Sequence, residues 1–416
     1  MTDHGTSYEL AVAEAERGNW EAAERYARAA VTIGGERYAA CLGKILAQVG
    51  KYDEARSWLL RALELQPADP DVLFFLGGMN GVLGMREESV AYFDQALVAR
   101  PDFPAARWSR DRILKEHRFL QTVQEALLQF AENTGRPVSN ASELGDIEFP
   151  STSRDVNGQP RFRMSLPASL ILSDLGAAAL FYSEVTGSGY EPGLRGFIEL
   201  HLASDDVFID VGAHWGIHSL TAATVRRREV SVLAVEAHPE NATRLGTWVR
   251  RNQLEEDVEI IPYAIADRKG VGQLAVNGSS MGHTMRKSGL DGSPHTIDIK
   301  ITTLDRVLKD RPHLHYRPII LKLDVEGCEI EALTGARILL SSGTVRAVIW
   351  EKGLFEDRQG QSARNQAVLE LLGSHGFEHF YFPDPNRGAL VPLEERDATC
   401  NVYSLAPGLE RKERYF

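Results

Sequence analysis

The 416-residue sequence predicts two unlike parts, an all-α solenoid of helical repeats and, after it, an α/β domain built on a Rossmann-like parallel sheet. Three observations predict this fold. Small residues recur at an offset of 34 in the N-terminal region, apolar strands alternate with helical patterns in the C-terminal half, and a turn with two glycines joins one of those strands to a helix.

The repeats come first along the chain, and the pairs that share the offset of 34 are Leu42/Leu76, Gly43/Gly77, Gly50/Gly84, Glu54/Glu88, Ala62/Ala96 and Pro67/Pro101. A weaker copy at 18–23 matches 50–55 at an offset of 32. This period, with small residues at fixed places, resembles the tetratricopeptide repeat, a pair of antiparallel helices. We expect about three repeats over residues 5–118, closed by a capping helix at 103–117. They would bind a protein partner or mediate self-association, and the sequence leaves both open.

A helical and polar linker is expected over residues 119–154, before an α/β domain at 155–410. Residues 120–132 have the apolar spacing of an amphipathic helix, and the turn residues at 133–137 end it.

The strand at 207–211 runs into the sequence Asp210-Val-Gly212-Ala-His214-Trp-Gly216, and helical spacing follows. Glycines there let the backbone approach a ligand, and the helix offers free amide groups at its start. Glu236 ends the next apolar strand, 20 residues past Gly216, where a carboxylate can accept both hydroxyls of a ribose. Because the spacing G-x-x-x-G differs from that of pyrophosphate-binding turns, we expect a nucleoside ligand without phosphates.

The later strands complete the predicted sheet. They fall at 260–267, 318–329, 345–350, 377–382 and 400–405, and a helix begins with Pro239-Glu240-Asn241. Asp324 and Glu326 are two residues apart, so in a strand their side chains would point the same way.

Three segments in this order resemble the FkbM family of class I methyltransferases. They are 210–216, 236–241 and the block Lys322-Leu-Asp-Val-Glu-Gly-Cys-Glu329, and the similarity spans about 190–355. The resemblance implies a seven-stranded Rossmann-like sheet that binds S-adenosylmethionine. One departure is His214, where the family usually has Asn. The expected cofactor-binding residues are Glu191, Asp210, Gly212, His214, Gly216, Glu236, Asn241, Ala264 and Ile265.

The expected catalytic residues are Asp324, Glu326 and His283, the last in a polar loop at 277–284. The two acids could serve as general base, bind sugar hydroxyls, or hold a divalent cation such as magnesium together with Glu351. The sequence does not separate these roles, and because no metal-binding spacing is present we assign no metal ligands.

Composition restricts the partners. The net charge of −12 argues against nucleic acid, since phosphate binding needs basic clusters that outweigh the acids. Neither a signal-like N-terminus nor an apolar run of roughly 20 residues is present, so no membrane partner is expected. The widely spaced Cys41, Cys328 and Cys400 suggest no disulfide framework and fit a soluble, cytoplasmic protein.

The resulting hypothesis is an O-methyltransferase that acts on a hydroxyl of a sugar, glycan or secondary metabolite, by resemblance. Two alternatives stay open. One is a peptide or protein methyltransferase whose repeats recruit the polypeptide. The other is an inactive cofactor-binding scaffold, which only the replacement at His214 favours.

Overall fold

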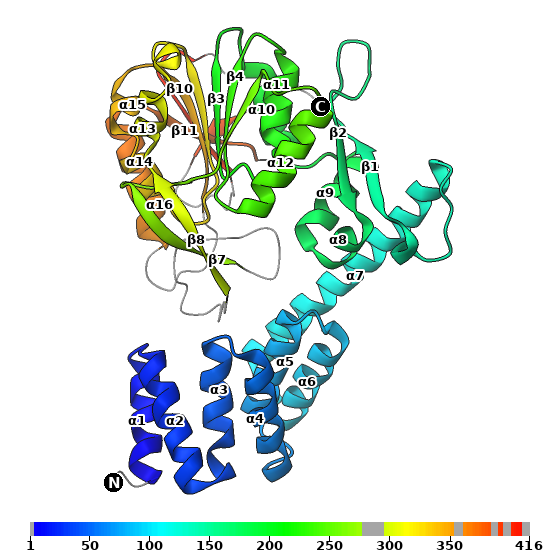
Figure 1. Cartoon of the computed structure of the whole chain (residues 1–416), viewed down its shortest axis with the longest axis vertical. Coiled ribbons are helices and arrows are strands. Elements are labelled where there is room, and N and C mark those ends of the chain that lie inside the picture. The colour runs from blue at the N-terminus through cyan, green and yellow to red at the C-terminus, as the bar shows by residue number, and fades with distance from the viewer. Residues whose placement is uncertain (1–3, 277–294, 353–360, 384–389, 394–400, 410–416) are drawn as a thin grey trace.

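A computed structural model describes residues 4–276, 295–352, 361–383, 390–393 and 401–409 of the chain (Figure 1). The N-terminal part consists of antiparallel helix pairs. The pairs are α1 (His4–Glu16) with α2 (Trp20–Gly34), α3 (Ala39–Gln48) with α4 (Tyr52–Leu65), and α5 (Pro70–Val82) with α6 (Arg86–Ala99). The short 3-10 helix η1 (Glu36–Tyr38) joins the first two pairs.

Glycine at the repeated positions has a packing reason. A Cβ on Gly43 would lie 2.6 Å from Cγ of Leu59, and one on Gly77 would lie 2.7 Å from Cε1 of Phe93. Each glycine therefore lets the two helices of its pair approach closely. The periodicity seen in the sequence thus reflects one helix-crossing geometry repeated along the solenoid.

Helix α7 (Pro104–Asn133) is a single helix of 30 residues, whereas the sequence suggested separate helices at 103–117 and 120–132. No glycine or proline interrupts residues 105–133, so nothing breaks the ladder of backbone hydrogen bonds. Ile113 packs in an apolar cluster with the repeats, while Leu120, Val123 and Leu127 belong to the core of the C-terminal part. The helix therefore joins the two hydrophobic cores.

The region expected as a polar linker contains packed structure. Its elements are η2 (Ala141–Glu143) and β1 (Asp146–Pro150). Strand β1 pairs antiparallel with β2 (Arg163–Pro167), which begins after the expected linker and is followed by α8 (Ala168–Ser173) and α9 (Leu175–Val185). Ile147 and Phe149 of β1 are buried in the same core as Leu120. The domain boundaries at 118 and 154 remain predictions.

The main sheet has the strand order β12-β11-β13-β10-β9-β3-β4-β5. Its parallel strands are β3 (Val207–Val211), β4 (Ser231–Val235), β5 (Val258–Ile261), β9 (Ile319–Leu323) and β10 (Val345–Glu351). The antiparallel strands are β11 (Glu378–Tyr381), β12 (Val391–Pro392) and β13 (Asn401–Leu405). The seven expected strands are present, and the two-residue β12 adds an eighth.

Helices cover both faces of this sheet. Alternate residues of β3 enter opposite cores: Phe208 packs with one set of helices, and Val207 and Ile209 with the other. The first set includes α10 (Pro192–His201), α11 (Ile217–Val225) and α12 (Pro239–Arg251). The second includes α13 (Leu304–Lys309), α14 (Glu329–Thr334), α15 (Arg337–Ser341) and α16 (Gln361–Ser374), with η3 (Pro312–Leu314) beside α13.

A second sheet follows the carboxyl end of β5. The expected strand at 260–267 is divided, because β5 ends at Ile261 and the chain then pairs elsewhere as β6 (Ala264–Ile265). Pro262 lies at the break and has no backbone N–H to continue the ladder. The new partner is β8 (His295–Thr302), which also pairs with β7 (Gly270–Val276). The β7–β8 pair projects from the main sheet toward the repeats (Figure 1).

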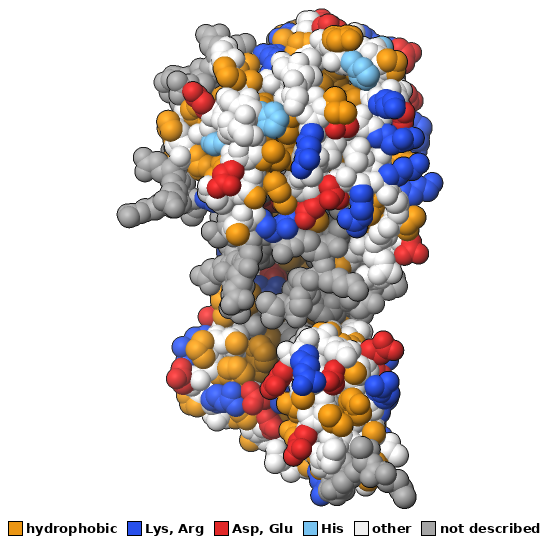
Figure 2. Space-filling model, turned by 90° about the vertical axis from the view of Figure 1, so that its left-hand side faces the viewer, with side chains coloured by type: hydrophobic (Ala, Val, Ile, Leu, Met, Phe, Trp, Pro, Cys, Tyr) orange, Lys and Arg blue, Asp and Glu red, His pale blue; other side chains and the backbone are white. Residues whose placement is uncertain are grey.

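The surface has no single character on the face seen in Figure 2, where acidic, basic and hydrophobic side chains are interspersed. Among the helices that the structure describes, none combines the length and the apolar composition needed to cross a membrane.

Candidate active site

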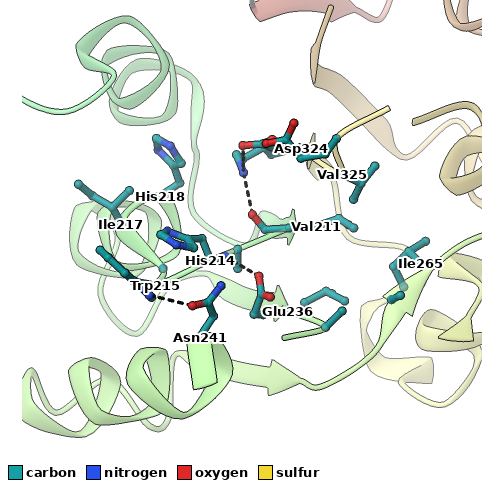
Figure 3. Close-up of a pocket in the computed structure, with 18 of the residues that line it drawn as sticks. Val211, His214, Trp215, Ile217, His218, Glu236, Asn241, Ile265, Asp324 and Val325 are labelled. Atoms are coloured by element: carbon teal, nitrogen blue, oxygen red, sulfur yellow. Dashed lines mark hydrogen bonds and ion pairs between the residues drawn. The ribbon is translucent and has the colours of Figure 1, made fainter. Parts of the chain in front are cut away.

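A cavity lies at the carboxyl ends of β3, β4 and β9, where ligands of doubly wound sheets bind (Figure 3). Its volume is about 1030 Å³ when the solvent at its mouth is included. Residues of the turn after β3 form one wall, residues that follow β4 and β9 form two more, and the segment before α10 closes the site.

The turn after β3 depends on its two glycines. Gly212 has φ +75°, and a Cβ there would lie 1.7 Å from the carbonyl oxygen of Asp324. Gly216 has φ +88°, and its Cβ would lie 2.1 Å from Cδ1 of Leu245. Both positions therefore exclude any side chain, and His214 between them also has a positive φ of 51°. The sequence prediction of a tight, ligand-approaching turn agrees with this geometry.

Glu236 holds that turn from the neighbouring strand. Its Oε2 accepts a hydrogen bond from the backbone N–H of His214 at 2.7 Å, and its Oε1 accepts one from the N–H of His238 at 2.7 Å. Each oxygen keeps a lone pair for a ligand in the cavity. Burial raises the pKa of Glu236 to about 7, although the two backbone hydrogen bonds and Lys322 act in the opposite direction.

His214 contributes to the turn mainly through its backbone. Its ring stacks on Trp215 with centroids 4.2 Å apart, and the Trp215 Nε1–H donates to Oδ1 of Asn241 at 3.0 Å. Asn241 is buried at the start of α12. The hydrogen bond from His214 to Glu236 uses an N–H that any residue other than proline would supply.

Lys322 on β9 lies beneath the turn and links three acceptors. Its Nζ is 3.1 Å from Oδ1 of Asp210, 3.3 Å from Oδ2 of Asp324 and 3.2 Å from the carbonyl oxygen of Gly212. Burial opposes its charge, but Asp210, Asp324 and Glu191 outweigh that effect and raise the pKa of Lys322. Asp210 also accepts from the Ser219 hydroxyl at 2.7 Å and does not line the cavity, so it supports the turn from below.

Three carboxylates lie close together, and two of them, Asp324 and Glu326, line the cavity. One oxygen from each of Asp324, Glu326 and Glu351 lies within 4.8 Å of the others, an arrangement that could hold a divalent cation. Burial and the charges of Asp324 and Glu326 raise the pKa of Glu351 to about 9. A neutral Glu351 relieves the repulsion between neighbouring acids by sharing a proton with Asp324.

The reason for this proximity differs from the expected one. Strand β9 ends at Leu323, so Asp324 and Glu326 lie in the following turn and not in a strand. Glu326 has φ 49° and Gly327 has φ 87°, which curls the chain back at this point. The turn, and not the alternation of a strand, brings the two carboxylates together.

A buried histidine and a half-buried glutamate pair at the segment before α10. The imidazole Nε2 of His218, on α11, is 2.6 Å from Oε2 of Glu191. Burial alone would raise the pKa of Glu191, but hydrogen bonds from His218 and Asn401 and the charge of Lys322 lower it. Tyr190 lines the cavity next to Glu191, and burial raises the pKa of its hydroxyl well above the usual value.

The opposite end of the cavity is mostly apolar. Ala264 and Ile265 of β6 line it, together with Tyr263 and with Leu274 of β7. Figure 3 shows Ile265 far from His218, at the other end of the labelled residues. Such a surface suits the flat face of a nucleobase.

The cavity brings together most of the residues expected from the sequence. Those that line it are Glu191, Gly212, His214, Gly216, Glu236, Asn241, Ala264, Ile265, Asp324 and Glu326. Asp210 lies beneath the turn, and His283 lies outside the described residues. Neither His218 nor a role for Lys322 was predicted from the sequence. Lys322 lies in the block that carried the family resemblance, and His218 follows Gly216 by two residues. This closeness to the two motifs is the signal in the sequence that could have identified them as site residues.

The strand order, the glycine turn after β3 and the acid after β4 are those of a class I methyltransferase. Residues 210–379 match the family described as the methyltransferase FkbM domain, and residues 36–79 match the tetratricopeptide repeat. The chain therefore contains an FkbM methyltransferase domain preceded by tetratricopeptide repeats. The search of curated proteins gave no match.

Solved structures similar to the chain include several tetratricopeptide proteins. The domain of Arabidopsis OM64 is 18% identical and covers 27% of this chain and 94% of its own, with a TM-score of 0.26. The first repeat domain of Spaghetti (RPAP3), bound to an HSP90 peptide, is 14% identical over 27% of this chain and 91% of its own, with a TM-score of 0.26. YrrB, a tetratricopeptide protein with an unusual peptide-binding site, is 23% identical and covers 27% of this chain and 58% of its own, with a TM-score of 0.26. Scores this low carry no further conclusion.

Proposed function

We propose that this protein is an S-adenosylmethionine-dependent O-methyltransferase that acts on a hydroxyl of a sugar, glycan or secondary metabolite. The observation that carries the proposal is one cavity with two chemically different regions. The first contains Glu236 and the apolar residues Ala264 and Ile265, and the second contains Asp324 and Glu326, with Glu351 beside them.

The residues of the first region fit the adenosine part of the cofactor. Glu236 is buried, is held by two backbone amides, and keeps lone pairs for two ribose hydroxyls. The apolar residues of β6 would contact the adenine, and Gly212 and Gly216 would allow the thioether chain to approach the backbone. S-adenosylmethionine, when bound, supplies an electrophilic methyl group on a positively charged sulfur.

The second region suits an acceptor with hydroxyl groups. Asp324 would accept the proton of the reacting hydroxyl, and Lys322, whose Nζ lies 3.3 Å away, would hold the Asp324 carboxylate in position. Glu351, neutral below a pKa of about 9, would donate its hydrogen bond to Asp324 and orient that carboxylate. Glu326 would accept from a further hydroxyl. The three acids thus offer one base, the donor that orients it and one acceptor without a metal ion.

Magnesium is the alternative use of these acids, since their oxygens lie close enough to share one cation. A turnover measurement with added chelator separates the two uses. Activity that survives chelation supports the base assignment to Asp324, and activity restored only by magnesium supports the cation.

The polypeptide-methyltransferase alternative has one structural feature in its favour. Helix α7 packs in both hydrophobic cores, so a protein docked on the repeats would be held near the catalytic part. The inactive-scaffold alternative is weakened, because the backbone N–H of His214 makes the hydrogen bond to Glu236 whatever the side chain.

The deciding experiment is calorimetry with S-adenosylmethionine and S-adenosylhomocysteine on the wild type and Glu236→Ala. We expect micromolar binding by the wild type and a loss of at least about tenfold in the variant, because two hydrogen bonds to a charged group disappear. Absence of binding by the wild type would refute the proposal. A methyl-transfer screen with sugar, polyketide and peptide acceptors then identifies the acceptor class.

A further inference from the structure

His218 is a buried polar residue in the cavity wall. Its side chain does not take part in holding the turn after β3. It is the second residue of α11, lines the cavity, and is 4% exposed. Its Nδ1 is buried and has no hydrogen-bond partner among the residues that the structure describes. Buried polar atoms without a partner are rare in folded proteins and indicate that a ligand or water completes the site.

Glu191 fixes the orientation of this ring. An ionised carboxylate only accepts hydrogen bonds, so the short contact of 2.6 Å places a hydrogen on Nε2 of His218 and leaves Nδ1 toward another group. Glu191 has the left-handed backbone angle φ 45° directly before Pro192, a conformation that costs energy for a residue with a side chain. Strain of this kind persists where the side chain has a required position.

The position of the pair matches one end of the expected cofactor. In Figure 3 His218 and Ile265 lie at opposite ends of the labelled residues, and Glu236 lies between them. A nucleoside with its base at Ile265 and its ribose at Glu236 therefore extends its 5′ substituent toward His218. Free amide groups in the first turn of α11 add positive potential at that end.

We propose that His218 and Glu191 recognise the zwitterionic amino-acid end of S-adenosylmethionine. The Nδ1–H of His218 donates to the cofactor carboxylate, and the Glu191 carboxylate accepts from its ammonium group. A donor and an acceptor held 2.6 Å apart complement a ligand group that offers one acceptor and one donor. This inference rests on the proposed function, because it assigns the methionine end of the same cavity.

The test compares ligands that differ only at the amino-acid end. Calorimetry is carried out with S-adenosylhomocysteine, its deaminated analogue, its decarboxylated analogue and 5′-methylthioadenosine. For His218→Phe, which keeps ring volume but cannot donate, we expect affinity to fall by about tenfold or more for the two ligands that carry a carboxylate. Affinity for the decarboxylated analogue and for methylthioadenosine should change less than about twofold.

Glu191→Gln provides the complementary measurement. This variant keeps a side chain that can pair with His218 but removes the negative charge. We expect it to weaken binding of ligands with an ammonium group and to leave methylthioadenosine binding unchanged. Thr224→Ala, on the same helix but away from the cavity, is the matched control and should bind all four ligands as the wild type does.

Three outcomes would overturn the inference while the proposed function stands. In the first, His218→Phe binds S-adenosylhomocysteine as tightly as the wild type. In the second, it loses affinity for methylthioadenosine to the same degree, which would assign the ring to support of the whole pocket. An increase in the acceptor KM alone would also overturn it, since the pair would then serve the acceptor. If the wild type binds none of the four ligands, the proposed function itself fails.

Discussion

The Glu236 carboxylate has two tasks, because the same oxygens hold the turn after β3 and face the cavity. Its backbone partners remain whether or not a ligand is bound. Ribose hydroxyls need an acceptor, and the neutral acid loses part of that capacity. We therefore expect the protonation of this side chain to control cofactor affinity.

This predicts a pH dependence of cofactor binding. The pKa of Glu236 is raised to about 7, so the carboxyl is mostly ionised above that pH and mostly neutral below it. We expect the affinity for S-adenosylhomocysteine to be constant above about pH 8 and to fall by up to tenfold per pH unit below 7, as measured by calorimetry from pH 5.5 to 8.5. Glu236→Gln should bind more weakly and with a flat profile. A wild-type profile without this inflection would contradict the assignment.

A second prediction concerns the buried pair Glu184 and Arg195. Oε1 of Glu184 accepts from Nη1 of Arg195 at 2.5 Å and from the backbone N–H of Tyr190 at 2.8 Å. Arg195→Met leaves a buried carboxylate without its cation, so we expect a loss of about 3–5 kcal/mol in the free energy of unfolding. Denaturant titration measures this loss.

The control for this pair is the double variant Glu184→Leu with Arg195→Met. Because it leaves no unpaired charge, it should recover part of the stability. It should still bind the cofactor more weakly than the wild type, since the segment that carries Tyr190 and Glu191 has lost its anchor. A single variant as stable as the wild type would show that the pair is dispensable.

Individual residues differed in how far the sequence revealed them. Glu236 could be predicted because its position depends only on the spacing between two adjacent parallel strands. His218 could not, because its significance comes from Glu191, which lies 27 residues earlier in the segment before α10. Asp210 was expected at the ligand, yet Lys322 and Ser219 hold it beneath the turn. The spacing of residues in the sequence does not show which distant segments contact each other, so site residues that depend on such contacts could not be predicted.

At the scale of elements, the turn between β3 and α11 has almost no freedom to change. Gly212→Ala places a Cβ against the carbonyl oxygen of Asp324 in addition to requiring φ +75°. We expect a loss of about 3 kcal/mol or more in the free energy of unfolding and no measurable cofactor binding. Urea unfolding and calorimetry provide the two measurements.

Gly187→Ala is the matched control for that variant. Gly187 has φ +84°, but a Cβ there would have no heavy atom within 4 Å. Its cost should therefore be limited to the backbone conformation, about 1–2 kcal/mol. Equal losses in the two variants would mean that the close approach of the turn to Asp324 is unimportant.

The strands were predictable because their alternation matches burial on two faces, as Phe208 and Ile209 illustrate. The exceptions have physical causes. Pro262 divides the third expected strand into β5 and β6, and the positive φ of Glu326 turns the chain after β9 where a longer strand was expected. Helix α7 was divided in the prediction although no residue breaks it.

At the scale of the whole molecule, α7 determines how the repeats stand relative to the catalytic part. Arg118 is exposed and lies between Ile113, in the cluster of the repeats, and Leu120, in the catalytic core. Arg118→Pro removes one backbone hydrogen bond and should cost about 3 kcal/mol of local helix stability. We expect a larger radius of gyration by small-angle X-ray scattering and unchanged binding of S-adenosylhomocysteine.

Arg118→Ala retains the helix and serves as the control, so its scattering curve should match that of the wild type. A proline variant with the compact scattering of the wild type would show that contacts other than α7 hold the two parts together.

The continuity of α7 also limits how the chain can change in length. Each residue inserted between Ile113 and Leu120 would turn the repeats by about 100° about the helix axis and move them by about 1.5 Å. Seven inserted residues would nearly restore the original angle, with a shift of about 10 Å. Insertions of seven residues should therefore be tolerated, because they nearly preserve the orientation of the repeats. Insertion of a single residue should reorient the solenoid relative to the catalytic part.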